Sequence, residues 1–271
     1  MQTNNRYPEI VYKYRNWVDD THKNVLLRNE LFFSSPRDFN DPFDCRIPLN
    51  FSLLDSEEKL SQYLSYGRQR REAETTMSKE DLDDMMSKFE LRLRTERDKT
   101  QEFYNSLYFE GVDNHYGVLS LTEKWNSILM WSHYGDCHRG YCVGFWQEKF
   151  RKSGVVNGGV AIYPEDNSFP GISPIDQNET KSTIQQVHTK SNEWKYESEF
   201  RLYKMFYPET ATVDARIHIV SDDYFAEINI GLSASVETQN ALIEIAKAKN
   251  IPVYRLSKVL FKFEVAREQI L

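Results

Sequence analysis

The chain of 271 residues lacks the sequence signatures of the commonest cofactor and hydrolase sites. It contains no Gly-x-Gly-x-x-Gly dinucleotide fingerprint, no Walker phosphate loop, no Gly-x-Ser-x-Gly nucleophile elbow and no His-Glu-x-x-His zinc motif. No run approaches the ~18 apolar residues that a membrane-spanning helix needs. These absences weigh against the most frequent nucleotide-dependent, hydrolytic and metalloprotease chemistries, and we expect no membrane partner.

An excess of positive charge is also missing, because 34 lysines and arginines face 41 aspartates and glutamates and leave a formal net charge of −7. A chain with this charge does not match a phosphate backbone as a whole, so any nucleic-acid contact needs a local patch. Cysteine is scarce and odd in number, with Cys45, Cys137 and Cys142, which favours reduced thiols. The first residues contain no apolar export segment, and we therefore expect a cytoplasmic protein.

The sequence does contain enough apolar residues for a packed core, with 40% hydrophobic and 14% aromatic residues. Strand and helix patterns interleave without an internal repeat or a flexible linker, which predicts a single α+β domain over residues 1–271. We expect strands at 9–16, 31–35, 116–121, 140–146, 160–163, 194–203, 217–220, 225–231, 253–256 and 259–265, and helices at 18–29, 125–134 and 235–249.

The segment at about 54–108 differs from the rest, because it is rich in Glu, Lys, Arg, Ser and Met and contains no proline. Ser78 to Asp81 forms a capping-box variant that predicts the start of the second of two helices. The apolar stripe of that helix is thin, which predicts an inserted helical hairpin that is partly exposed. Its arginines either bind an acidic partner or belong, with the neighbouring acids, to a solvated face.

The most informative stretch is the charged, aromatic segment from Trp194 to Tyr203. At the two-residue period of a β-strand, Glu197, Glu199 and Arg201 fall on one side. The two carboxylates then lie roughly 7 Å apart, with the guanidinium beside them to keep both ionised. Such a pair can act on two ends of one bound group. The alternative is a solvated ladder of alternating charge on an edge strand.

A basic pair lies on the first predicted strand, in the sequence Tyr12-Lys13-Tyr14-Arg15. Alternation places Lys13 and Arg15 on one face and the two tyrosines on the other. Two cations on one face can hold a pyrophosphate, and a tyrosine such as Tyr14 can stack on a flat ring. The alternative is a surface strand whose tyrosines belong to the core.

Polar and turn-forming residues are dense between Ser34 and Asp44. Asn40 and Asp41 favour Asx-turns, which fix a loop without any ligand. The density of acids and aromatics exceeds what a turn requires. This favours the wall of a binding site that includes Ser34, Ser35, Asn40 and Asp41.

An aromatic segment with two histidines occupies residues 130–140. Trp131 can stack on a ligand, while His133 and Tyr134 can hydrogen-bond its polar groups. A metal held by His133, Cys137 and His138 is the alternative, but no Cys-x-x-Cys pair or second ligand pair accompanies them. A Cys–His nucleophile is disfavoured as well, since nothing marks a cysteine here as a thiolate.

Four motifs, YKYR, LFFSSPRDFNDPFD, MWSHYGDCHRGYCVGF and WKYESEFRLY, together resemble a widespread bacterial family known as a domain of unknown function. The resemblance covers most of the chain except the helical insertion. The order of the motifs is also similar to that of the ADP-ribosyltransferase fold, with a basic first strand, a middle strand with Ser or Tyr and a late strand with Glu. This similarity implies a split antiparallel β-sandwich around a cleft that binds NAD as a substrate.

The resemblance also implies roles for individual residues. Lys13 or Arg15 takes the first position, and Ser34 or Ser35 takes the second, with Ser120 as a further candidate. A Ser-Thr-Ser sequence at the second position is absent here.

Glu199 takes the third position, where it would hydrogen-bond the ribose 2′-hydroxyl as nicotinamide leaves and positive charge develops. Glu197 would align or deprotonate the acceptor nucleophile. The implied function is an NAD-dependent ADP-ribosyltransferase, a toxin or phage-defence effector that modifies a protein or a nucleic acid, with an antitoxin or inhibitor protein as a candidate partner. Two alternatives are a non-catalytic nucleotide-sensing or interaction module of a defence system, and a nuclease built on His133, His138 and the acids of the 39–44 loop.

Overall fold

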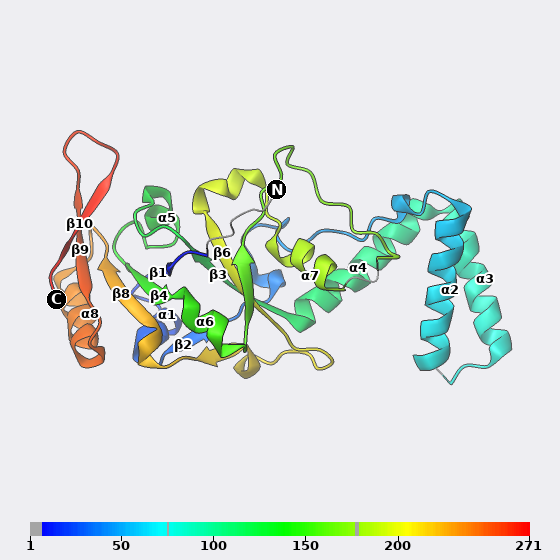
Figure 1. The fold of residues 1–271 in the computed structure, drawn as a ribbon, viewed down its shortest axis with the longest axis horizontal. Coiled ribbons are helices and arrows are strands. Elements are labelled where there is room, and N and C mark those ends of the chain that lie inside the picture. The colour runs from blue at the N-terminus through cyan, green and yellow to red at the C-terminus, as the bar shows by residue number, and fades with distance from the viewer. Residues whose placement is uncertain (1–6, 75, 177–178) are drawn as a thin grey trace.

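Most strands of the chain join one large mixed sheet, seen in a computed structural model that describes residues 7–74, 76–176 and 179–271 (Figure 1). The strand order is β10-β9-β8-β4-β1-β3-β6-β5, and all neighbours are antiparallel except β8 and β9. A separate two-stranded sheet pairs β2 with β7. The strands are β1 (Ile10–Arg15), β2 (Glu30–Phe32), β3 (Tyr116–Thr122), β4 (Tyr141–Trp146), β5 (Asn157–Val160), β6 (Glu199–Met205), β7 (Ile217–Ile219), β8 (Phe225–Ile230), β9 (Val253–Lys258) and β10 (Val265–Gln269).

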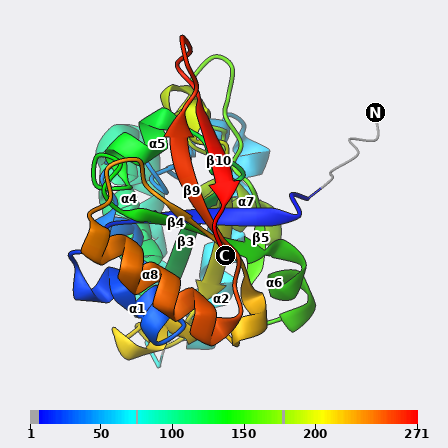
Figure 2. The ribbon, with the colours of Figure 1, turned by 90° about the vertical axis from the view of Figure 1, so that its left-hand side faces the viewer.

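The central strands are buried because helices cover both faces of the sheet. Every residue of β8 is buried, as expected for a strand with no solvated face. On one face the core includes residues of α1 (Asp20–Leu27), α6 (Gln147–Ser153) and α8 (Val236–Lys249), and Figure 2 shows α1 and α8 on the same side. On the other face, residues of α5 (Ile128–His133) pack against β1, β9 and β10.

The sheet is weakest at its middle, between β1 and β3. β1 pairs with β4 along six residues but meets β3 only at Tyr12 and Thr122. The prediction of an α+β chain with mainly antiparallel strands is confirmed. The hydrogen bonds join the strands into one sheet across this single pair, where the sequence predicts two smaller sheets around a cleft.

The insertion contains three helices, α2 (Glu57–Glu74), α3 (Lys79–Thr95) and α4 (Arg97–His115), where the sequence predicts two. Ser78 caps α3 as predicted, since its side chain accepts from the Asp81 amide. α2 and α3 form one end of the elongated molecule, and α4 connects them to the sheet (Figure 1). α4 continues past the predicted end of the insertion at about residue 108 to His115, and its Asp113 bonds with Ser35 and Arg46.

Three further sequence predictions are wrong. Residues 259–264 form a turn between β9 and β10 instead of a strand, and β5 ends at Val160, where the sequence predicts the start of a strand. α7 (Glu179–His188) is a helix where the sequence predicts none. None of the helices in the described ranges is both long and apolar enough to cross a membrane.

Candidate functional site

A pocket of about 540 Å³ opens where β1 and β3 diverge, within the range of roughly 300–1,000 Å³ typical of small-molecule sites. Its walls come from β1, β3, the loop after β2, α5 and the segment that leads into β6. The lining consists of Tyr12, Lys13, Tyr14, Arg15, Phe32, Ser34, Asp38, Phe39, Asn40, Asp44, Val118, Ser120, Leu121, Met130, His133, Tyr134, Lys190, Trp194, Glu197 and Glu199.

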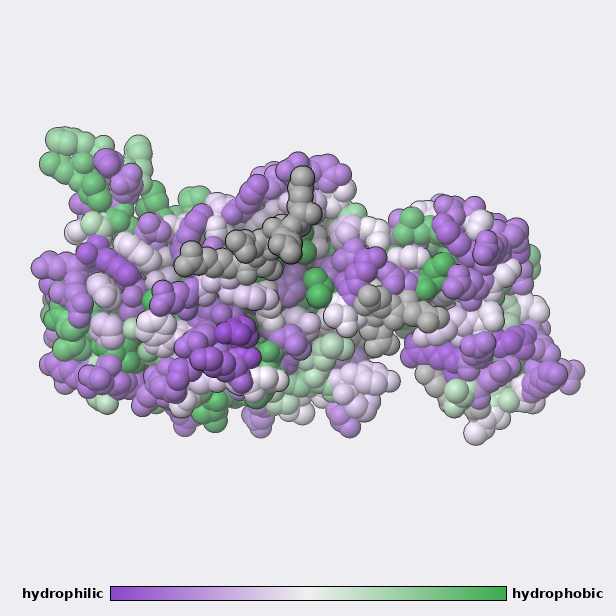
Figure 3. Space-filling view, viewed as in Figure 1, coloured by the Kyte–Doolittle hydropathy of each residue, from purple (hydrophilic) through white to green (hydrophobic). Residues whose placement is uncertain are grey.

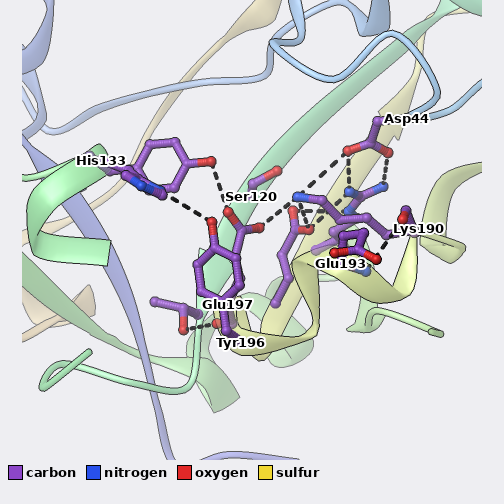
Figure 4. Close-up of polar contacts among 12 residues, drawn as sticks. Asp44, Ser120, His133, Lys190, Glu193, Tyr196 and Glu197 are labelled. Atoms are coloured by element: carbon purple, nitrogen blue, oxygen red, sulfur yellow. Dashed lines mark hydrogen bonds and ion pairs between the residues drawn. The ribbon is translucent and has the colours of Figure 1, made fainter. Parts of the chain in front are cut away.

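A buried ionic network forms the acidic end of this pocket (Figure 4). The Arg201 guanidinium donates to both oxygens of Asp44 at 2.7 and 2.6 Å, and to both oxygens of Glu199 at 2.9 Å. Arg201 is fully buried and both carboxylates are nearly so. The alternative of a solvated charge ladder is therefore wrong.

Lys190 completes the network from the segment after α7. Its ammonium lies 2.6 Å from Glu197 Oε2 and 3.1 Å from Glu199 Oε2, and 4.9 Å from the centre of the Trp194 ring. Burial by itself raises the pKa of Glu199, but Arg201 and Lys190 outweigh it and hold that pKa below its ordinary range. Burial likewise opposes the charge of Lys190, yet Glu199 and Glu197 hold its pKa above the ordinary value.

The two glutamates do not share one strand face as the sequence predicts. Glu197 ends a short 3-10 helix (Asn192–Glu197), and Ser198 follows in the left-handed region with φ 45°. β6 begins only at Glu199. The irregular segment is fixed by Thr122, whose hydroxyl donates to the Glu197 carbonyl oxygen at 2.5 Å, and by Tyr163, whose hydroxyl accepts from the Glu199 amide at 3.0 Å. Both carboxylates nevertheless reach the same pocket.

An aromatic wall faces the glutamates from α5. Tyr134 donates its hydroxyl to Glu197 Oε1 at 2.8 Å, and burial together with Glu197 raises the pKa of Tyr134. His133 Nδ1 lies 3.1 Å from the Tyr196 hydroxyl. Trp131 is completely buried behind this wall, and its ring meets the Tyr14 ring edge to face with the ring centres 5.0 Å apart. It therefore supports the pocket from behind.

The other end of the pocket is basic. Lys13 donates to the Ser120 carbonyl oxygen at 2.6 Å, and Arg15 Nη1 makes only a 3.5 Å bond to the Tyr14 carbonyl oxygen. Neither side chain has a carboxylate within ion-pair distance in the described part of the chain, and the buried Arg15 Nε has no hydrogen-bond partner there. Burial lowers the pKa of both groups. For Lys13 the neighbouring Arg15 adds to this, and Glu199 and Glu197 oppose it without outweighing it. A bound anion would stabilise their charged forms.

Nine of the thirteen predicted site residues line the pocket, although they come from four separate motifs. They are Lys13, Tyr14, Arg15, Ser34, Asn40, His133, Tyr134, Glu197 and Glu199.

The remaining four predicted residues lie behind the surface of the pocket. Ser35 donates to the Asp113 carbonyl oxygen, and Asp41 accepts from the Phe43 amide in the Asx-turn that the sequence also allows. Trp131 and Arg201 are fully buried. These four residues position the site without lining it.

The sequence misses two charged groups of the site. Lys190 lies in a segment without strand or helix periodicity, and its spacing from Glu197 and Glu199 matches no known motif. Asp44 lies in the predicted loop, but only the structure shows that it pairs with Arg201.

The proposed histidine pair for a nuclease does not assemble at this pocket. His138 stacks on Trp131, with ring centres 6.0 Å apart, and is not among the lining residues that include His133. No group of three or more His, Cys, Asp or Glu side chains in the described ranges is arranged to hold a metal ion.

Comparison with known proteins gives one match. A family model described as "Protein of unknown function (DUF2971)" matches residues 130–202, which run from α5 through the two glutamates into β6. This segment supplies the aromatic wall and the charged groups of the acidic end except Asp44. Neither the curated proteins nor the solved structures contain a match.

Proposed function

We propose that the chain is an NAD-dependent ADP-ribosyltransferase whose substrate binds in the pocket between β1, β3 and β6. The observation that carries this proposal is the division of charge within one pocket. At the acidic end, three carboxylates face two cations and leave one net negative charge. At the basic end, Lys13 and Arg15 have no carboxylate within ion-pair distance in the described residues, although Glu199 and Glu197 act on Lys13 from further away. NAD carries an anionic diphosphate and a cationic nicotinamide ring, so its charges complement the two ends.

The ADP-ribosyltransferase fold belongs to the same proposal. The order of a basic strand β1, a middle strand β3 with Ser120, and a late strand β6 with Glu199 supports it. The near-separation of the sheet between β1 and β3 is also what a split sandwich with a cleft requires.

In the proposed reaction, Glu199 stabilises the transition state. As the bond between the ribose and nicotinamide breaks, positive charge develops on the sugar, and a carboxylate hydrogen-bonded to the 2′-hydroxyl stabilises that charge. Arg201 and Lys190 keep Glu199 ionised. Each carboxylate oxygen has two acceptor positions; Arg201 and Lys190 fill both on Oε2 and one on Oε1, so the ribose hydroxyl would take the remaining position on Oε1 in place of the Ser120 hydroxyl.

Glu197 faces the acceptor in this proposal. Its Oε1 accepts from Tyr134 and its Oε2 from Lys190, which holds the carboxylate in one orientation at the pocket surface. A carboxylate fixed in this way can align an acceptor nucleophile or take its proton. The acceptor is a protein or a nucleic acid, and a toxin or phage-defence role with an antitoxin or inhibitor partner suits such chemistry.

The proposal is tested by incubating the protein with NAD labelled in the adenylate part, in the presence of cell lysate. Label transfer and free nicotinamide are expected with the unmodified chain, and Glu199→Gln should reduce both by about a hundredfold or more. Glu193→Gln is the matched control, because Glu193 is an exposed residue of the short helix that precedes β6.

A non-catalytic nucleotide-sensing module is the second candidate. The bonds of both Glu199 oxygens to Arg201 favour it, because they also suit a purely structural carboxylate. NAD binding without nicotinamide release would support this second function, and an absence of NAD binding would contradict both.

A further inference from the structure

A hydrophobic tip projects from the end of the molecule opposite α2 and α3. The turn between β9 and β10 exposes Leu260, Phe261 and Phe263 at 75%, 95% and 97% of their surface. Figure 3 shows this tip standing clear of the body. None of the hydrophobic core clusters in the described ranges includes these three side chains. Large apolar groups exposed this fully and this close together mark an interaction surface.

The turn at the tip holds one residue in an unfavourable backbone conformation. The Lys262 amide donates to the Val259 carbonyl oxygen, which defines a β-turn with Phe261 at its third position. Phe261 has φ 63°, a conformation that such turns usually assign to glycine or asparagine. A bulky aromatic side chain at this position strains the backbone without filling the core. Strain of this kind points to a function for the residue.

A second apolar surface lies beside the hairpin. Met130 and Trp131 of α5 belong to one core cluster with Leu256 and Val265 in the strands of the hairpin, and both ribbon views place α5 next to β9 and β10. On its outer side α5 exposes Ile128 and Leu129 at 38% and 49%. The same end of the molecule therefore presents a projecting apolar tip and a neighbouring apolar patch.

We infer that this end of the molecule is the interface of a two-fold homodimer, in which the tip of each chain covers α5 of the other. A two-fold contact joins two different patches reciprocally, and two-fold dimers are the commonest assemblies. Burying two phenylalanines and a leucine accounts for roughly 500 Å² of each chain. With the α5 patch, the total approaches the ~800 Å² per partner of a standard interface. The tip alone would fall short, so the reciprocal arrangement is required.

Charge disfavours an anionic lipid surface as the occupant. The hairpin carries Arg255, Lys258, Lys262 and Arg267 against Glu264 and Glu268, but Arg267 pairs with Glu227 of β8, and Lys262 lies 3.7 Å from Glu264. The charges that remain exposed, three basic and two acidic, fall short of the clusters of about four to eight Lys and Arg that bind anionic membranes. A second copy of the chain requires no such excess.

Sedimentation equilibrium of the full chain tests the inference. We expect twice the chain mass of 32.0 kDa at micromolar concentration. The double variant Phe261→Ser/Phe263→Ser should weaken association at least a hundredfold while its circular dichroism is unchanged. Phe103→Ser is the matched control, because Phe103 is 58% exposed on α4 and should leave the dimer intact.

Cross-linking tests the reciprocal geometry. In a Cys137→Ser background, a chain with Leu129→Cys should form a disulfide with a differently tagged chain that carries Phe263→Cys. A monomeric unmodified chain, a dimer that survives the double variant, or a mixture without the cross-link would overturn the inference. A monomer that co-floats with phosphatidylserine vesicles would assign the tip to lipid and overturn it as well.

Discussion

Arg201 and Asp44 form a two-pronged ion pair, with distances of 2.6 and 2.7 Å, in the interior of the protein. The pair ties the loop after β2 to the third residue of β6, which lies 157 positions later in the chain. Both side chains are almost completely inaccessible to water. The contact therefore fixes one wall of the pocket against another.

Asp44→Ala is predicted to destabilise the protein strongly. The substitution leaves Arg201 buried with fewer partners, and breaking a buried ion pair typically costs about 3–5 kcal/mol. Urea unfolding followed by circular dichroism measures the change. Asp20→Ala is the control, because Asp20 forms an exposed pair with Lys23 and should change the free energy of unfolding by under ~1 kcal/mol. A similar small loss for Asp44→Ala would show that the pair is unimportant for the fold.

Lys13→Met and Arg15→Met are predicted to weaken NAD binding by about tenfold or more each. Each variant removes a charge-assisted contact to the diphosphate, and such contacts contribute about 1.5–3 kcal/mol. Calorimetry at two salt concentrations should also show a weaker salt dependence in the variants. Lys23→Met serves as the control because Lys23 lies on α1, outside the pocket lining. Unchanged affinity in both variants would remove the diphosphate from the basic end of the pocket.

The strands around the pocket could be predicted from the sequence because their signals are local. The patterns of β1, β3, β4 and β8 depend on alternation or on continuous apolar runs, which a single segment displays. The residues of the aromatic and acidic walls were found for the same reason. The convergence of these segments on one pocket depends on strand order, which the sequence does not display.

The end of the alternation at Glu197 was not predicted, because the apolar face from Trp194 to Leu202 is interrupted only by the single polar residue Ser198. The chain there leaves the strand path through a left-handed residue that is neither glycine nor asparagine. Lys190 was missed because its two ion pairs are tertiary contacts with no periodic pattern. Side chains that act through contacts between distant parts of the chain leave no local pattern in the sequence.

His188→Gln is predicted to make the protein less sensitive to acid. Burial, with Arg201 nearby, lowers the pKa of His188 from 6.5 to about 4. Below pH 6.5, His188 therefore binds a proton in the unfolded chain but not in the folded chain. The free energy of unfolding falls as the pH falls. Between pH 6.5 and 4.5 this amounts to about 2–3 kcal/mol.

Urea unfolding at several pH values checks this effect. The slope of stability against pH should decrease in His188→Gln but not in the control His133→Gln, whose histidine is exposed. His22, with its pKa lowered to about 4 by burial, should sustain part of the slope in both. Equal slopes in the two variants would contradict the assignment to His188.

Replacing residues 57–95 with a short Gly-Ser linker is predicted to leave the sheet folded. α2 and α3 pack in a separate cluster with Phe51 and Leu54, away from the main core. A matched deletion extended through residue 115 should unfold the protein, because Asp113 of α4 pairs with Arg46 and its carbonyl oxygen accepts from Ser35. Proteolysis and circular dichroism distinguish the two, and loss of folding in the shorter deletion would place α2 and α3 in the core. Altered partner binding in the shorter variant is expected if the insertion docks an inhibitor.

Glu197→Gln is predicted to reduce transfer to the acceptor more than it reduces NAD hydrolysis. The change keeps the size of the side chain but removes the charge that would align or deprotonate a nucleophile. Glu199→Gln should reduce both reactions together, because the charge on the ribose develops in each. Measuring nicotinamide release and label transfer in parallel separates the two roles.

Tyr134→Phe is the matched control for the orientation of Glu197, since it removes only the 2.8 Å hydrogen bond to Oε1. Equal loss of both reactions in Glu197→Gln would assign the two glutamates to one function, with Lys190 joining them as a single unit.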